Sequence, residues 1–134
     1  MDAQTARDRV ARAPVGHLAT VTPQGRPHVV PCCFVLAGRW IYSAVDAKPK
    51  RTLALRRLDN IAAHGSVALL VDRYDEEWRD LWWVRVDGTA QLWEAGPRRD
   101  EALAALAGKY RQYRETTPPG PVIAVAVTGW HWWP

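Results

Sequence analysis

The sequence has few cysteines and no long apolar run. Its two cysteines, Cys32 and Cys33, are adjacent, and neighbours in an extended strand point to opposite faces, so we expect no disulfide between them. No apolar run approaches the ~20 residues that a bilayer crossing needs, which predicts that the chain does not span a membrane. The first residues lack a basic stretch followed by an apolar one, so we expect no secretory signal and a reducing, cytoplasmic location.

Motifs that mark several common enzyme classes are also missing. The sequence contains no Gly-x-Gly-x-x-Gly after a strand, no phosphate-binding P-loop and no Gly-x-Ser-x-Gly nucleophile elbow. Its four histidines, with no i, i+4 pair and no Cys-x-x-Cys beside them, predict no metal site. If the protein is an enzyme, we therefore expect a cofactor to supply the reactivity.

The composition fits one small domain with a mild positive charge. The length of 134 residues, without an internal repeat or a linker, predicts a single domain over residues 1–134. Lysine and arginine total 18 against 14 aspartate and glutamate, a net charge of +4 that favours an anionic partner. Eight tryptophans against one phenylalanine are typical of an interface or of a site for a planar ligand, because indole offers a large flat apolar surface.

Three segments have helical spacing. Residues 2–13 carry a small apolar stripe behind a capping residue, Asp2, and are expected to lie over one end of a barrel. Residues 48–58 begin a short crossover helix. Residues 97–114 give the strongest helical pattern, with acidic residues in the first turn and basic ones near the end.

The remaining segments alternate as strands do. Pro27 and Pro31 lack the N–H of a ladder, so the second strand must lie at a sheet edge or be bulged there. Residues 82–93 have the clearest alternation of apolar and polar residues. The continuous apolar run within residues 66–72 suggests a strand buried on both faces. We predict a mainly β fold with short helices, a six-stranded antiparallel split barrel of the FMN-binding type, with strands at residues 17–21, 26–36, 40–45, 66–72, 82–93 and 121–133.

A basic cluster is the densest functional signal. Lys48, Lys50, Arg51 and Thr52 are followed by the pair Arg56 and Arg57. At a junction between strand and helix, such side chains and free backbone N–H groups are suited to hold a phosphate. The alternative is a solvated helix face. The acidic loop at residues 74–77 and the modest net charge oppose nucleic-acid binding.

Several segments resemble a known family. Residues 16–31 (GHLATVTPQGRPHVVP), 46–52 (DAKPKRT), 55–61 (LRRLDNI), 67–72 (VALLVD) and 81–90 (LWWVRVDGTA) are similar to the split-barrel flavin-binding family that includes pyridoxamine 5'-phosphate oxidase. Within that family they resemble the actinobacterial branch of probable oxidoreductases dependent on the deazaflavin coenzyme F420. The chain lacks the long C-terminal part of pyridoxamine 5'-phosphate oxidase, so vitamin B6 oxidation is not expected.

The resemblance implies a homodimer with a cofactor site in each groove between subunits. It assigns the cofactor phosphate to Lys48, Lys50, Arg51 and Thr52. It assigns ring contacts to six residues, namely His28, Val30, Pro31, Cys32, Ser43 and Val45. It places Trp78 and Trp82 on the substrate side of the groove, with Trp130, His131 and Trp132 contributed by the partner subunit.

Our hypothesis from the sequence is an F420-dependent oxidoreductase. It would transfer hydride from the reduced deazaflavin to a small, flat, conjugated substrate, with the protein supplying position and exclusion of water. Two alternatives stay open: an FMN-dependent oxidoreductase of the same fold, and a non-catalytic carrier of F420 or flavin. The sequence does not identify a catalytic residue.

Overall fold

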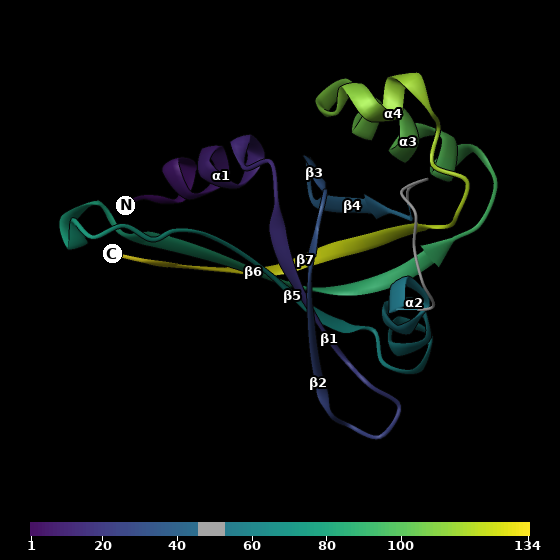
Figure 1. Cartoon of the computed structure of the whole chain (residues 1–134), viewed down its shortest axis with the longest axis horizontal. Helices are drawn as coiled ribbons and strands as arrows, with labels where there is room; N and C mark the ends of the chain where they lie inside the picture. Colours follow the sequence, from purple (N-terminus) through teal and green to yellow (C-terminus); the bar gives the residue numbers. More distant parts are fainter. Residues whose placement is uncertain (46–52) are drawn as a thin grey trace.

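Seven strands form one curled antiparallel sheet (Figure 1). The computed structural model of the chain describes residues 1–45 and 53–134. The sheet order is β2-β1-β5-β6-β7-β4-β3, so β2 and β3 lie at its two edges. The strands are β1 (Gly16–Val21), β2 (Pro27–Cys32), β3 (Val35–Ala37), β4 (Trp40–Ala44), β5 (Ser66–Arg73), β6 (Trp82–Trp93) and β7 (Val122–Trp133).

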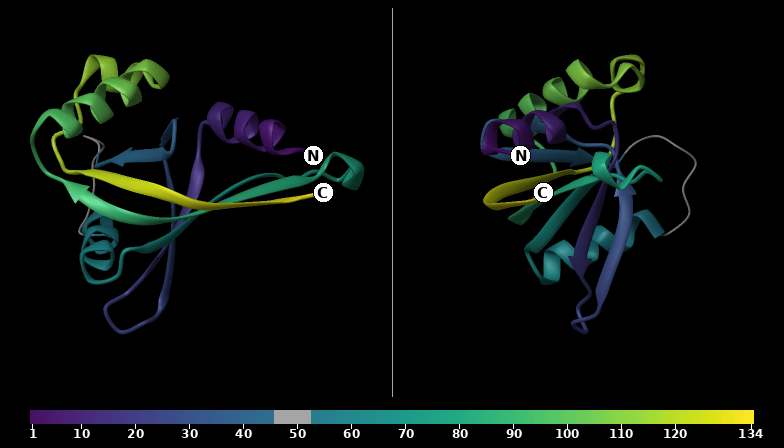
Figure 2. Two further views of the ribbon diagram at one scale, coloured as in Figure 1. Left: turned by 180° about the vertical axis from the view of Figure 1, so that it is seen from behind. Right: turned by 90° about the vertical axis from the view of Figure 1, so that its left-hand side faces the viewer.

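The six-strand prediction is wrong because the expected strand at residues 26–36 breaks in two. Phe34 donates its backbone N–H to the Tyr110 hydroxyl oxygen at 3.0 Å, and its carbonyl oxygen lies 2.9 Å from the same hydroxyl. A side chain thus satisfies the backbone groups that a continuous strand would have used. Pairing passes from β1 on one side of the break to β4 on the other, which curls the sheet into a half-barrel (Figure 2).

The edge position of β2 confirms the reading of its prolines. Pro27 and Pro31 pair with β1 on one side only. In contrast, β5 is not buried on both faces as predicted, because its exposure alternates. Val71 is buried, whereas Leu70 is 37% exposed. The sheet therefore has an inner face, which carries Val71 and the main core, and an outer face, which carries Leu70.

Two hydrophobic clusters lie on opposite faces of the sheet. The inner one includes Val84 and Val86 of β6, with Val10 from α1 (Ala3–Arg12) and Ile61 from α2 (Leu53–Ala63). The outer one joins β4 and β7 to α3 (Pro97–Lys109) and α4 (Arg111–Glu115), with Leu106 at its centre. Helix α3 thus covers only one end of the outer face.

The helices follow the sequence prediction with one interruption. Asp2 caps α1 and accepts a 2.8 Å hydrogen bond from the Thr5 N–H. Hydrogen bonds from the backbone and side chain of Thr5 lower the pKa of the Asp2 carboxyl group. The expected helix at 97–114 divides at Tyr110, whose backbone is extended. The first residues of the predicted crossover helix lie outside the described residues, and α2 continues it.

An arm extends from the rest of the molecule (Figure 1). It consists of residues 74–81, which include the short 3-10 helix η1 (Trp78–Asp80), with the adjoining ends of β5, β6 and β7. Both chain termini lie along it, and the Met1 amino group donates to the Pro134 carbonyl oxygen at 3.0 Å.

Candidate functional site

The inner face of β2 carries three of the predicted ring contacts. Register with β1 pairs Val30 with the buried Leu18, and His28 with the buried Thr20. Since alternate residues share a face, His28, Val30 and Cys32 point to the same side of the sheet. The His28 Nδ1 atom is buried and has no hydrogen-bond partner among the described residues, so it is available to a bound group.

Helix α2 brings a buried arginine to this region. Asn60 donates from its side-chain amide to the Thr20 hydroxyl at 3.0 Å, which attaches α2 to β1. One turn earlier, Arg57 is only 6% exposed, and its Nε atom has no hydrogen-bond partner within residues 1–45 and 53–134. Burying a guanidinium costs free energy unless its donors are satisfied, so Arg57 is suited to an anionic ligand.

Cys32 of β2 and Ser43 of β4 also lie on the inner face of the sheet. The Ser43 hydroxyl donates to the Cys33 carbonyl oxygen at 2.7 Å. Burial raises the pKa of the Cys32 thiol, and this effect outweighs the hydrogen bond with Ser43 and the positive charge of Arg57, which favour the thiolate. Cys32 is therefore a neutral thiol at pH 7 and not an activated nucleophile. Both cysteines are free, as the sequence predicts.

The predicted substrate-groove residues divide between the two faces of the arm. Trp130 and Trp132 pack against the inner core, where Arg7 of α1 lies 5.0 Å from the Trp130 ring centroid. The Trp132 Nε1–H donates to the Met1 carbonyl oxygen at 3.2 Å. His131 is on the outer face, with its Nε2 atom 3.3 Å from an Asp87 carboxylate oxygen.

The remaining two tryptophans of that set are separated as well. Trp82 lies beneath Arg9 of α1, whose guanidinium carbon is 4.7 Å from the ring centroid. Trp78, in η1, is 76% exposed. Within one chain, Trp82, Trp130 and Trp132 thus share the inner face under α1, whereas His131 and Trp78 lie apart from them.

Neither a metal-binding cluster nor a membrane-spanning helix is found among the described residues. Within residues 1–45 and 53–134, no three His, Cys, Asp or Glu side chains gather in a way that could hold a metal ion. Among the helices of that part of the chain, none combines the length and apolar character needed to cross a bilayer.

Comparison with known proteins identifies the family. A family model described as pyridoxamine 5'-phosphate oxidase matches residues 3–134. The chain belongs to this family. No curated protein is significantly similar to the sequence.

Solved structures share the fold of this pyridoxamine 5'-phosphate oxidase family member. A conserved hypothetical protein from Mycobacterium tuberculosis is 17% identical, with a TM-score of 0.78 over 99% of this chain and 84% of that one. A FAD-binding protein from Mesorhizobium loti is 19% identical, with a TM-score of 0.71 over 98% and 94%. A heme storage protein from Vibrio cholerae is 14% identical, with a TM-score of 0.75 over 96% and 92%.

The family member brings together some of the predicted cofactor residues. His28, Val30, Cys32 and Ser43 share the inner side of the sheet, whereas Pro31 is exposed on the outer face opposite His17. Val45 follows β4, and its backbone N–H lies 3.5 Å from the Pro121 carbonyl oxygen. The four predicted phosphate ligands, Lys48, Lys50, Arg51 and Thr52, lie outside the described residues.

Arg57 was absent from the predicted cofactor set. The sequence signal was present, because the basic cluster includes the pair Arg56 and Arg57. Only packing distinguishes the two, since Arg56 is exposed and Arg57 is buried.

Proposed function

We propose that the protein is an oxidoreductase that binds coenzyme F420 against the inner face of β2 and reduces a small, planar, conjugated substrate. The observation that carries the proposal is the buried guanidinium of Arg57, with an unsatisfied Nε donor, on the helix that follows the basic run at residues 48–51. The solved FAD-binding protein of the same fold supports a ring of the flavin type.

The positive charge of Arg57 and of the basic run suits the acidic tail of such a cofactor. Arg57 would hold an acidic group of the F420 tail, together with Lys48, Lys50, Arg51 and Thr52. Val30 and Val45 would contact the ring, and the unpartnered His28 Nδ1 atom would hydrogen-bond to it. When bound, the deazaflavin supplies two-electron hydride transfer, so these residues need only bind, orient and exclude water.

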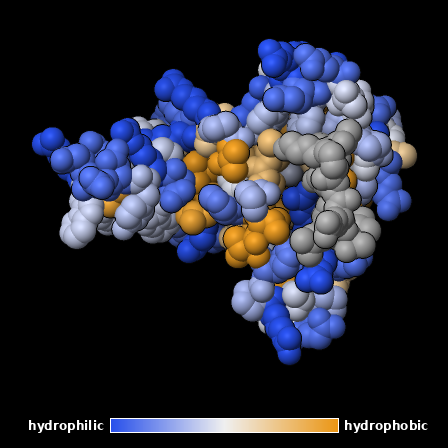
Figure 3. Space-filling view, in the orientation of Figure 1, coloured by the Kyte–Doolittle hydropathy of each residue, from blue (hydrophilic) through white to orange (hydrophobic). Residues whose placement is uncertain are grey.

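A second copy of this chain is the proposed partner. Among the described residues, no helix covers the outer face of β2 and β1, and Val29 of β2 is 60% exposed. Figure 3 shows apolar surface gathered where these strands cross. Exposed apolar area of this kind is typical of subunit contacts, and a homodimer would place each cofactor site near residues of the partner.

Replacing Val29 with aspartate tests the dimer. We expect at least about tenfold weaker self-association, because a carboxylate would lose its hydration in the apolar contact. Sedimentation velocity measures the effect, with Ala104→Asp, on the exposed side of α3, as a matched control. A wild-type chain that sediments as a monomer at all concentrations would contradict the dimer.

Separate titrations of the full chain with F420, FMN and heme test the cofactor. We expect F420 to bind more tightly than FMN, because its phosphate, lactate and glutamate groups offer more acidic contacts to the basic run. Binding of F420, followed by oxidation of reduced F420 in the presence of quinones or unsaturated ketones, supports an enzyme. Binding without turnover supports a carrier, preferential FMN binding supports the flavin alternative, and heme binding alone rejects the proposal.

A further inference from the structure

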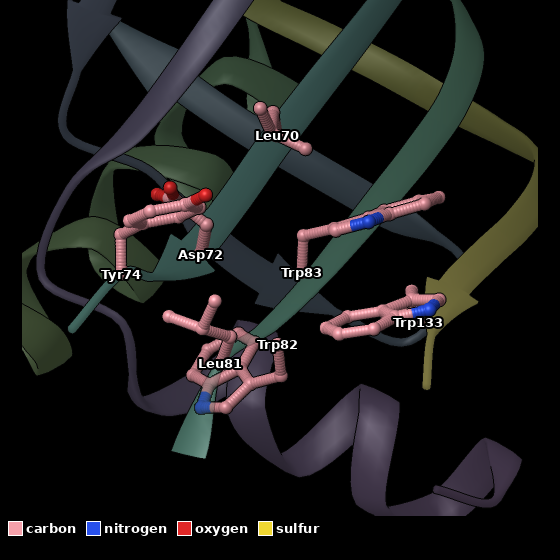
Figure 4. A pocket seen from close by; sticks show the side chains of 7 residues that line it. All are labelled: Leu70, Asp72, Tyr74, Leu81, Trp82, Trp83 and Trp133. Carbon is pink, nitrogen blue, oxygen red and sulfur yellow. The ribbon is translucent and has the colours of Figure 1, made fainter. Parts of the chain in front are cut away.

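The arm carries a pocket of about 370 Å3 that the proposed cofactor site does not use. Four aromatic side chains line it, Tyr74, Trp82, Trp83 and Trp133. In Figure 4 the rings of Trp83 and Trp133 lie on one side, with Tyr74 across from them and Trp82 at the base. Trp83 and Trp133 are cross-strand partners between β6 and β7, so the sheet itself holds these two rings side by side.

The lining of the pocket is negatively charged. Asp72 is the only charged residue among those that line it, and β5 places it directly opposite Trp83. Among the described residues, no hydrogen bond or ion pair to the Asp72 carboxylate is found. The pocket therefore combines electron-rich ring faces with a carboxylate that is free to pair.

A cationic side chain already lies over one tryptophan ring of the lining. Arg9 lies over Trp82 at 4.7 Å from the ring centroid. Arg9 and Arg12 line the neighbouring pocket, which Trp82 and Asp72 also border. Arg9 therefore covers part of the Trp82 ring, whereas the rings of Trp83, Trp133 and Tyr74 border the space in Figure 4.

We propose that this pocket binds a small quaternary ammonium group. Ring faces attract a cation electrostatically, and the attraction is strongest for tryptophan. A quaternary ammonium is only weakly hydrated and needs no hydrogen-bond acceptor, which suits the open rings of Trp83, Trp133 and Tyr74 beside one carboxylate. An anion would meet Asp72 without a positive partner in the lining. The proposal does not depend on F420 binding.

Choline and its neutral isostere 3,3-dimethylbutan-1-ol give a matched pair of probes. We expect choline to bind the full chain at least about tenfold more tightly than the isostere, since the two differ chiefly in charge. Calorimetry and tryptophan fluorescence measure binding. Asp72→Asn and Trp133→Leu are each expected to weaken choline binding at least about fivefold, with little effect on the isostere for Asp72→Asn.

Two variants outside the lining serve as controls. Asp75→Asn removes a nearby carboxylate that faces Arg73 at 3.6 Å, and Trp78→Leu removes a tryptophan that is 76% exposed. Both should bind choline as the wild type does. Circular dichroism of each variant confirms folding, and Asp72→Asn, a nearly isosteric change on an exposed residue, keeps the test valid if Trp133→Leu unfolds. Equal binding of the two probes, no binding of either, or unchanged choline binding by Asp72→Asn would overturn the proposal.

Discussion

Replacing Arg57 with methionine is expected to weaken F420 binding about 30-fold, because charge-assisted hydrogen bonds contribute roughly 1.5–3 kcal/mol. The Arg57 guanidinium is buried on α2, where a bound anion gains more from it than from an exposed charge. Methionine retains the length of the apolar stem, so we expect the ligand-free variant to remain folded. Fluorescence titration with F420 gives the dissociation constant, and thermal unfolding monitors the fold.

The adjacent arginine provides the matched control. Arg56 lies on the exposed side of α2, and Arg56→Met is expected to change F420 affinity less than about threefold. Arg57→Lys, which keeps a positive charge but loses the planar fork of donors, should give an intermediate affinity. Wild-type affinity in Arg57→Met would remove Arg57 from the site while leaving F420 binding itself intact.

Replacing Lys109 with methionine is expected to stabilise the protein by about 2 kcal/mol at pH 7. Burial lowers the pKa of the Lys109 amine from 10.5 to about 8, and its Nζ atom has no hydrogen-bond partner in the part of the chain that the structure describes. The Phe34 ring, 4.0 Å away, offsets part of the cost of charging it. Since Lys109 as a whole is only partly buried, solvent screens part of the penalty, which keeps the expected gain below the full value of the pKa shift.

The stabilisation expected for Lys109→Met depends on pH. Between pH 8 and 10.5 the unfolded chain binds a proton at Lys109 that the folded chain has released, so the contribution of Lys109 to stability rises with pH. The advantage of Lys109→Met should therefore shrink as the pH rises through this range. The comparison is made as a difference between variant and wild type, because raised pKa values of Cys32 and Tyr110 make stability fall with pH at the alkaline end in both proteins.

Denaturant unfolding at a series of pH values measures the effect. Arg111→Met removes an exposed cation on α4, whose Nε atom lies 3.7 Å from a Glu115 oxygen, and should leave stability within about 0.5 kcal/mol of the wild type. A destabilised Lys109→Met at pH 7, or a difference that does not vary with pH, would contradict the assignment.

Local pattern was sufficient for most elements. Alternation over residues 82–93 predicts β6 with its observed bounds, and the capping residue Asp2 predicts the start of α1. The prolines of β2 place it at an edge. These features depend on residues that are neighbours in sequence, so their physical causes are visible there.

The break in the strand after β2 could not be predicted from local sequence. It depends on the Tyr110 hydroxyl, which reaches the backbone of Phe34 from 76 residues further along the chain. Likewise, the apolar run in β5 does not reveal that Leu70 stays exposed on its outer face. Both errors arise because a partner distant in sequence, or its absence, decides whether a backbone or side chain is satisfied.

The sequence by itself determined the family resemblance, the antiparallel sheet and the basic cluster as a candidate anion site, because each is written in local spacing and residue type. Only the tertiary structure decided that Arg57, and not Arg56, is buried, since the Asn60–Thr20 hydrogen bond fixes which side of α2 faces the sheet. It also decided that Trp130 and Trp132 face inward under α1 while Trp83 and Trp133 border an open pocket. Strand alternation separates these two sets of tryptophans, but the face that becomes covered depends on where a distant helix packs.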